Sequence, residues 1–243
     1  MPIVVDRFVV LHTRPYQESS LIIDAFAEKH GRLSFIAKGI KNPKKSHLRA
    51  HLQMTAELEA PVSSRGNLKS LNQFEVVTPP SVFVGERFAV ANYVSELCLR
   101  GLQPNEVQTD LYATVKTTFA GLADAQAIEP LLRKFESVLI IAMGIMPNYQ
   151  TDADGNKVVA ENFYQLFNNE AFKLVDKQSL ELAGQRIFSG HCLQNMLTVE
   201  NLTKSDLTDL KFLNRRLLMS IIGSKPLQSR RLWHEWKNNA QQH

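Results

Sequence analysis

The chain has 243 residues, of which 44% are hydrophobic and 21% charged, a composition typical of folded globular proteins and unlike disordered, collagen-like or coiled-coil chains. This length accommodates one or two domains, and a formal net charge of +4 with a pI near 9.0 is only mildly basic. The longest apolar run, residues 138–146, is shorter than the roughly 18 residues of a membrane helix, so no membrane partner is expected.

The N-terminus and the cysteines indicate where the protein works. Asp6 and Arg7 interrupt the first apolar segment, so it does not have the pattern of a secretory signal peptide. The two cysteines, Cys98 and Cys192, are far apart in the sequence, which favours a reducing compartment over a disulfide-bonded fold. We therefore expect a cytoplasmic protein.

The first eighty residues predict β-strands, because apolar and β-branched residues alternate there in short segments separated by turns. Five such strands are enough for a small closed barrel. The prolines Pro79 and Pro80 then stop the pattern, so we expect a domain boundary at this point, with domains over residues 1–80 and 81–243. The expected strands cover residues 4–11, 21–26, 33–38, 54–60 and 68–77.

The remainder of the chain has the three- and four-residue spacing of helices. A small β-hairpin is expected within residues 158–174, with Asn168 and Asn169 at its turn. The predicted fold class is α+β, with a five-stranded barrel followed by an all-α domain that carries the hairpin as an insertion. The expected helices cover residues 85–102, 106–122, 128–146, 180–188, 194–199, 205–222 and 229–237.

Positive charge is concentrated near the N-terminus. Seven Lys or Arg lie between residues 29 and 49, whereas residues 29–56 contain no Asp or Glu. One interpretation is a solvated loop, and the other is a surface that faces nucleic-acid phosphates. The candidate DNA-binding residues are Arg14, Arg32, Lys38, Lys41, Lys44, Lys45 and Arg49.

A nucleic-acid surface also needs flat side chains on which bases stack. Tyr16 and His30 lie in polar surroundings and are the stacking candidates. Phe26 and Phe35 lie in apolar, alternating segments, so we expect them in the core.

Catalytic and metal-binding signatures are missing from the sequence. It has no phosphate-binding loop, dinucleotide-binding glycine pattern or nucleophile elbow. His47 and His51 have the spacing of two ligands on one helix face, but no Glu or Cys nearby completes a metal site. We expect no enzyme activity, no metal and no cofactor.

Four segments near the two ends of the sequence form a recognisable set: residues 10–21 (VLHTRPYQESSL), 30–34 (HGRLS), 37–39 (AKG) and 223–230 (GSKPLQSR). Together they resemble the RecO family of bacterial recombination mediators, which has a second glycine where this sequence has Ser224. The resemblance implies an N-terminal OB-fold, a helical C-terminal domain and a cytoplasmic, nucleoid-associated location. Some members carry a four-cysteine zinc module after the central helix, but residues 147–169 contain no cysteine, so zinc is not expected.

The resemblance also implies partners. Such proteins bind single- and double-stranded DNA, anneal complementary strands, bind RecR and help to load RecA onto strands covered by single-stranded-DNA-binding protein. The acidic, apolar-ended tail of that last protein needs a hydrophobic slot with a cationic rim. The expected tail-binding residues are Leu132, Arg133, Lys134, Phe135 and Leu139, with Arg215, Arg216, Arg230 and Arg231 as further candidate cations.

Two other functions stay open from the sequence. One is a barrel that binds structured RNA, such as a tRNA- or ribosome-associated factor. The other is an adaptor whose helical part binds proteins while the basic segment is incidental. No constellation of polar residues supports a small-molecule enzyme.

Overall fold

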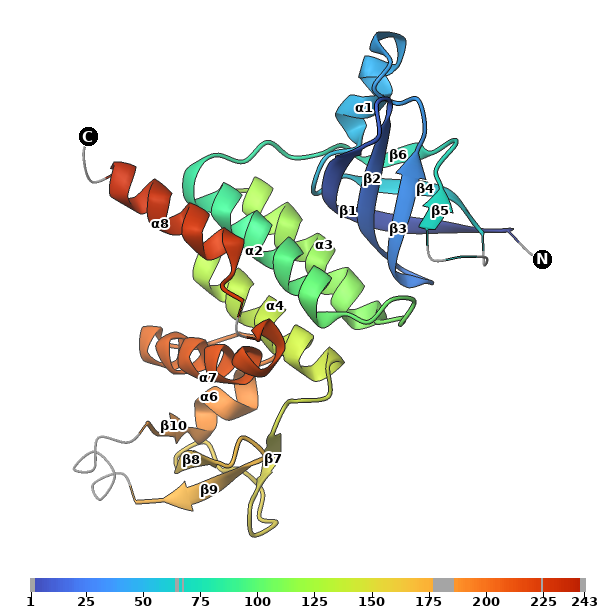
Figure 1. Cartoon of the computed structure of the whole chain (residues 1–243). Helices are drawn as coiled ribbons and strands as arrows, with labels where there is room; N and C mark the ends of the chain where they lie inside the picture. Colours follow the sequence, from blue (N-terminus) through green and yellow to red (C-terminus); the bar gives the residue numbers. More distant parts are fainter. Residues whose placement is uncertain (1–2, 64–65, 67, 177–185, 224, 241–243) are drawn as a thin grey trace. The chain divides into compact units, whose positions relative to one another are not determined.

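The structure, a computed structural model, describes residues 3–63, 66, 68–176, 186–223 and 225–240 (Figure 1). Contacts between residues divide the chain into two compact units. Residues 1–126 and 225–243 form the first unit, and residues 127–224 form the second. The first unit continues past residue 80, because the helices that directly follow the strands pack with them.

A six-stranded sheet with the order β5-β3-β2-β1-β4-β6 forms the N-terminal barrel. The segment expected as one fifth strand is split, so that β5 pairs in parallel with β3 and β6 pairs antiparallel with β4. One stretch of chain therefore joins both edges of the sheet, which confirms the OB-fold. The strands are β1 (Ile3–Tyr16), β2 (Ser20–Ala27), β3 (Gly31–Ala37), β4 (Glu57–Ser63), β5 (Leu68–Ser70) and β6 (Glu75–Thr78).

The barrel core consists of alternate residues of these strands. The rings of Phe8 and Phe35 stack with their centroids 4.6 Å apart, and Ile23 and Leu58 are fully buried beside them. Phe26 is also fully buried, but it packs edge-on against the ring of Tyr112 outside the barrel. The expectation that Phe26 and Phe35 are core residues is confirmed.

The first two long helices, α2 (Gly85–Gly101) and α3 (Thr109–Ala123), lie in the same unit as the barrel. The start of β3 meets the loop between them. Gly31 has φ +66°, and a Cβ there would come within 2.0 Å of the Glu106 carbonyl oxygen, so this position requires glycine. The next residue, Arg32, donates from Nε to the carbonyl oxygen of Leu102 at 2.9 Å. Residues 30–34, one of the segments that carry the resemblance, thus join the barrel to the helices.

A buried carboxylate forms a second joint. Glu57 on β4 accepts hydrogen bonds from the hydroxyls of Tyr112 at 3.0 Å and Thr78 at 3.2 Å, and it pairs with the ammonium of Lys116. Only 5% of Glu57 is exposed, so these three donors compensate for its lost hydration. One residue therefore ties β4, the end of β6 and α3 together.

The C-terminal helix α8 (Gln228–Ala240) returns to the first unit and packs on α2 (Figure 1). The carboxylate of Glu96 on α2 accepts from the backbone N–H groups of Gln228 at 3.0 Å and Ser229 at 2.9 Å, and from the Ser229 hydroxyl at 2.8 Å. Arg100 donates to the carbonyl oxygens of Lys225 at 2.6 Å and Pro226 at 2.9 Å. This Glu96–Arg100 clamp gives the GSKPLQSR ending a physical role, because it caps α8 and fixes the chain that enters it.

Within its described residues, the second unit combines three helices with a small sheet of order β10-β8-β9-β7. The expected hairpin is present as β8 and β9, joined at Asn168 and Asn169 in the left-handed conformation, but it belongs to a larger, four-stranded sheet. The helix expected over residues 180–188 lies mostly outside the described residues. The elements are α4 (Ile128–Ala142), β7 (Asn148–Asp152), β8 (Phe163–Phe167), β9 (Ala171–Val175), β10 (Phe188–Ser189), α6 (Gly190–Asn195) and α7 (Lys204–Ile222).

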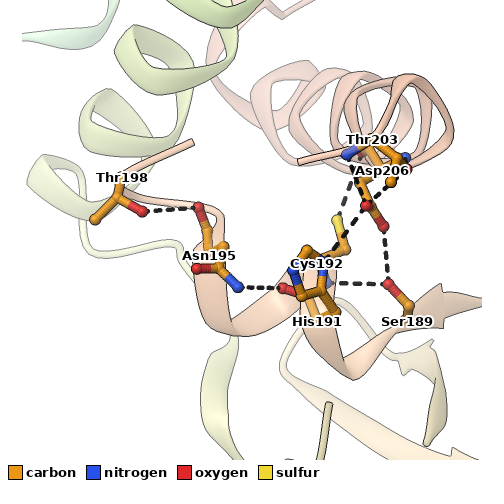
Figure 2. A network of polar contacts seen from close by, with 7 residues as sticks. All are labelled: Ser189, His191, Cys192, Asn195, Thr198, Thr203 and Asp206. Atoms are coloured by element: carbon orange, nitrogen blue, oxygen red, sulfur yellow. Dashed lines mark hydrogen bonds and ion pairs between the residues drawn. The ribbon is translucent and has the colours of Figure 1, made fainter. Parts of the chain in front are cut away.

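A polar network around Asp206 holds β10 and α6 to α7 (Figure 2). Thr203 is the N-cap of α7, and it forms a capping box with Asp206. The Asp206 carboxylate also accepts from the Ser189 hydroxyl at 2.9 Å and pairs with His191 at 3.5 Å. Cys192 is buried beside it, with its backbone N–H donating to Ser189. The network is structural, because its groups satisfy one another.

Across the described ranges, no helix combines the length and hydropathy that crossing a bilayer requires.

The Glu96–Arg100 clamp yields a stability prediction. Burial raises the pKa of Glu96, but the hydrogen bonds from Ser229 and Gln228 and the charge of Arg100 outweigh it, so this pKa lies below its ordinary value. The clamp therefore stabilises the fold above the ordinary pKa of glutamate and loses this contribution as the pH falls through the lowered pKa. We expect Glu96→Ala to lower the free energy of unfolding by about 1–3 kcal/mol at neutral pH.

Urea unfolding followed by tryptophan fluorescence measures this change, since both tryptophans lie on α8. The control is Glu75→Ala on the exposed strand β6, which should change the free energy of unfolding by less than about 0.5 kcal/mol. Equal stability of the two variants at neutral pH would contradict the proposed role of the clamp.

Candidate nucleic-acid interface

The acid-free basic segment folds as a short helical excursion between β3 and β4 that is anchored to the barrel at both ends. It contains the 3-10 helix η1 (Pro43–Lys45) and the helix α1 (Ser46–His51). At its start, the N–H of Lys41 donates to the carbonyl oxygen of Ser19 at 3.0 Å. At its end, Leu52 is fully buried in the barrel core, and its carbonyl oxygen accepts from the Thr13 hydroxyl at 2.8 Å. The segment is therefore built into the fold and is not a free loop.

Four cations of this excursion point into solvent. Lys38, Lys44, Lys45 and Arg49 are all exposed. No carboxylate in the described part of the chain forms an ion pair with these four, and the nearest acids in the sequence are Glu28 and Glu57. Four unneutralised charges on one anchored excursion produce a positive potential suited to a phosphate backbone.

The other three candidate cations have partners within the protein. Arg14 on β1 is half-exposed and lies 3.7 Å from the Asp24 carboxylate. Lys41 donates from Nζ to the carbonyl oxygen of Gln17 at 2.9 Å. Arg32 is held by Leu102, as described above. Lys41 lies within the basic segment and Arg14 lies on β1, but Arg32 serves the joint between barrel and helices.

Asp24, a carboxylate on the barrel surface, contacts two basic side chains of β1. The interaction with His12 is the largest influence on Asp24, and together with a hydrogen bond from Ser34 and the charge of Arg14 it lowers the pKa of this carboxyl despite partial burial. Asp24 therefore carries its negative charge at neutral pH and holds His12 and Arg14 side by side on β1. A phosphate that approaches Arg14 has to compete with this pairing.

The two stacking candidates differ in their surroundings. Tyr16, at the end of β1, is 38% exposed and is available to a base. His30 instead forms a 2.7 Å contact from Nδ1 to the buried carboxylate of Asp6, which also accepts from the backbone N–H of Lys29. His30 is thus committed to the turn between β2 and β3.

The expected tail-binding residues lie on α4, in the second unit. Phe135 and Leu139 are fully buried, and Arg133 is only 4% exposed, with its guanidinium 3.1 Å from the Glu136 carboxylate. The Asn214 side chain on α7 donates to the Arg133 carbonyl oxygen at 3.3 Å. Lys134 is exposed and Leu132 is half-buried. Arg133, Phe135 and Leu139 are therefore packed inside the second unit, where they do not line an open slot with a cationic rim.

The second unit contains an open cavity of about 280 Å³ that sequence reasoning missed. The guanidinium of Arg186 lies 4.9 Å above the ring of Phe212, which is 41% exposed. Arg216, one of the further candidate cations, donates from Nε to the Asn169 side chain at 2.7 Å. Apolar walls and two guanidinium groups thus meet in one place. The cavity is lined by Gln165, Leu166, Arg186, Phe188, Phe212 and Arg216.

An OB-fold barrel with an anchored, acid-free basic excursion defines an OB-fold nucleic-acid-binding protein. Family profiles described as "Recombination protein O N terminal" and "Recombination protein O C terminal" match residues 1–80 and 83–217. The chain belongs to the RecO family of DNA repair proteins.

Individual relatives match nearly the whole chain. It is 33% identical over 226 residues to DNA repair protein RecO of Alteromonas mediterranea, which covers 92% of this chain and 94% of that protein. It is 32% identical over 228 residues to DNA repair protein RecO of Aliivibrio fischeri, covering 93% and 94% of the two chains. DNA repair protein RecO of Vibrio cholerae is 32% identical over 231 residues, covering 94% and 93%.

The structure also bears on metal binding. The described residues contain no cluster of three or more His, Cys, Asp or Glu that could hold a metal ion. Burial raises the pKa of the Cys192 thiol to about 12 and also raises that of Cys98, which disfavours the thiolate form that binds zinc.

We predict that the purified protein contains no stoichiometric zinc and that dialysis against a chelator leaves its thermal midpoint unchanged. Elemental analysis of protein prepared in zinc-supplemented medium tests this, and a value near one zinc per chain would contradict it.

Proposed function

We propose that this chain is a non-enzymatic mediator of recombinational repair. It binds single- and double-stranded DNA through the basic excursion of the barrel and anneals complementary strands. Together with RecR it helps to load RecA onto DNA coated by single-stranded-DNA-binding protein. The single observation that carries the DNA-binding part is the set of exposed cations Lys38, Lys44, Lys45 and Arg49 on an OB-fold, which form no ion pair with any described carboxylate. Membership of the RecO family supports the annealing and loading parts.

The proposal predicts a salt-dependent affinity that a charge reversal removes. If about four phosphates of a single strand are neutralised, raising salt from about 50 to 200 mM should weaken binding roughly fifty-fold. Lys44→Glu, Lys45→Glu and Arg49→Glu together should nearly abolish binding, because these exposed side chains lie outside the core and serve no joint in the fold. Fluorescence anisotropy with a labelled single strand measures both effects.

The matched control reverses three exposed lysines of the second unit, Lys157, Lys173 and Lys204, which changes the net charge by the same amount. It should retain most of the wild-type affinity. An unchanged affinity in the barrel variant would contradict the proposal. A folded RNA that competes better than single-stranded DNA would instead support an RNA-binding role.

For the tail of single-stranded-DNA-binding protein we propose the Arg186–Arg216 cavity rather than the residues on α4. An acidic peptide with an apolar end needs exposed cations next to a hydrophobic recess. Phe212 and Leu166 provide the apolar wall, and Arg216 provides the charge, with Arg186 beside it exposed but paired with Asp209 at 3.3 Å. The α4 cation Arg133 is already paired and buried, so a peptide could reach it only if α4 and α7 separated.

Arg216→Ala should weaken binding of a labelled tail peptide by up to about fivefold, since exposed ion pairs contribute only ~0.2–1 kcal/mol. Removal of the apolar end of the peptide should weaken it by about ten- to a hundredfold, because a buried apolar side chain contributes more. Lys211→Ala, on the same helix but outside the cavity lining, is the control and should bind the peptide normally.

The labelled peptide is titrated against the wild type, Arg216→Ala and Lys211→Ala, and the three dissociation constants are compared. Equal dissociation constants for wild type and Arg216→Ala would rule out this cavity as the tail site. Binding of naked single-stranded DNA should be the same in all three, because the basic excursion belongs to the other unit.

A further inference from the structure

The helix α8 has one face packed in the fold and an opposite face that is strongly cationic. Ser229 is buried, and Trp236 packs against the backbone of Gly85, where an added Cβ would come within 2.7 Å of the indole nitrogen. Side chains at positions i, i+4 and i+7 share one face of a helix. Arg230, His234 and Lys237 have this spacing, and all three are exposed.

Two more residues border this cationic stripe. Arg231 is exposed on one side and pairs with Glu235 at 3.4 Å. Trp233 lies on the other side, with the ammonium of Lys237 5.1 Å from its ring and the ring of His234 5.2 Å away. The described helix carries three Arg or Lys against one carboxylate, so its exposed face is positive.

Helix stability does not explain this arrangement. Arg230 and Arg231 lie in the first turn, where the helix dipole disfavours positive charge, and that turn contains no acidic residue. The Glu96 carboxylate caps the turn from α2, but it is engaged by Gln228, Ser229 and Arg100. An anion bound along the stripe would relieve the unfavourable placement.

We propose that the stripe of Arg230, His234 and Lys237, with Trp233 beside it, is a second nucleic-acid-binding surface that holds one single strand separately from the basic excursion of the barrel. Arg230 and Lys237 contact phosphates, the ring nitrogens of His234 lie between them, and the Trp233 ring provides a face for a base. This inference rests on the proposed DNA-binding function, and it goes further because two separate strand sites on one chain would bring complementary strands together for annealing.

An anionic membrane is the other polyanion that a basic, tryptophan-bearing helix commonly binds. That mode requires the apolar face of the helix to enter the lipid. Here this face is occupied, since Ser229 is held by Glu96 and Trp236 packs on Gly85. The exposed cations therefore favour a ligand that binds by charge and stacking alone.

The two tryptophans of the chain are both on α8, so intrinsic fluorescence reports on this surface without a label. The test uses the full chain carrying the barrel reversal Lys44→Glu, Lys45→Glu and Arg49→Glu, in which the first site is disabled. A single strand should still quench the fluorescence, with an affinity that falls about sevenfold between about 50 and 200 mM salt, as expected for roughly two phosphates contacted by Arg230 and Lys237.

Adding Arg230→Gln, His234→Gln and Lys237→Gln should remove this residual binding. Glu235→Gln, a control on the same helix that removes a negative charge instead, should preserve or strengthen it. In an otherwise wild-type chain the same triple neutralisation should leave the affinity for a first strand within about twofold and should abolish energy transfer between two differently labelled, non-complementary strands. Unfolding midpoints of all variants establish that α8 stays docked.

Each other result would overturn the inference. Residual binding that survives the α8 neutralisation would place the second strand elsewhere. Loss of first-strand affinity in the α8 variant would indicate one continuous site. Quenching by vesicles of anionic lipid but not by DNA would assign the helix to membranes. An unchanged affinity in the barrel variant would contradict the proposed DNA site of the barrel, but the effect of the α8 substitutions could still be measured. A wild-type chain that binds no strand would overturn both the proposed barrel site and the proposed α8 site.

Discussion

Glu57 is the residue on which the architecture of the first unit depends. Its buried carboxylate has to be compensated, and its donors come from β6 and from two positions of α3. The barrel and helices are thereby joined by a charge that neither could bury alone. Tyr112 adds to the joint with its ring against Phe26, and burial together with the adjacent Glu57 charge raises the pKa of its hydroxyl, which keeps it protonated and donating.

The need to compensate the buried Glu57 carboxylate also explains why the first compact unit extends beyond residue 80. Without α2 and α3, Glu57 would lose two of its donors and Phe26 would lose its covering ring. The backbone approach of Gly31 to Glu106 adds a steric condition at the other end of the interface. Hydrophobic periodicity identifies where strands change to helices, but these side chains decide that both kinds of element share one folding unit.

Local patterns predicted much of this fold. The strands over 21–26 and 33–38, the helix α2 and the turn at Asn168 and Asn169 are close to their expected positions, because alternation, helical spacing and turn chemistry act over a few residues. The division of the fifth strand into β5 and β6 was not predictable in this way. It depends on pairing with two different edges of the sheet, which a local pattern does not record.

The candidate site was predicted in part for the same reason. A charge count identifies Lys44, Lys45 and Arg49 but assigns equal weight to Arg32, whose partner Leu102 is 70 residues away. Arg133 is a still clearer case, since its neighbour Asn214 comes from a helix 81 residues later. Whether a cationic side chain already has a partner within the protein depends on contacts between residues far apart in the sequence. The exposed and unpaired cations could therefore be identified only from the structure.

The return of α8 to α2 has a consequence for the order in which the protein matures. Glu96 and Arg100 are synthesised well before Lys225 and Ser229, with the entire second unit between them. At about 5–20 residues per second, a ribosome needs roughly ten seconds to make the intervening chain. The second unit can therefore fold as an insertion before α8 is made, and during this time the face of α2 that α8 later covers stays exposed. The first unit is completed last, although its strands are made first.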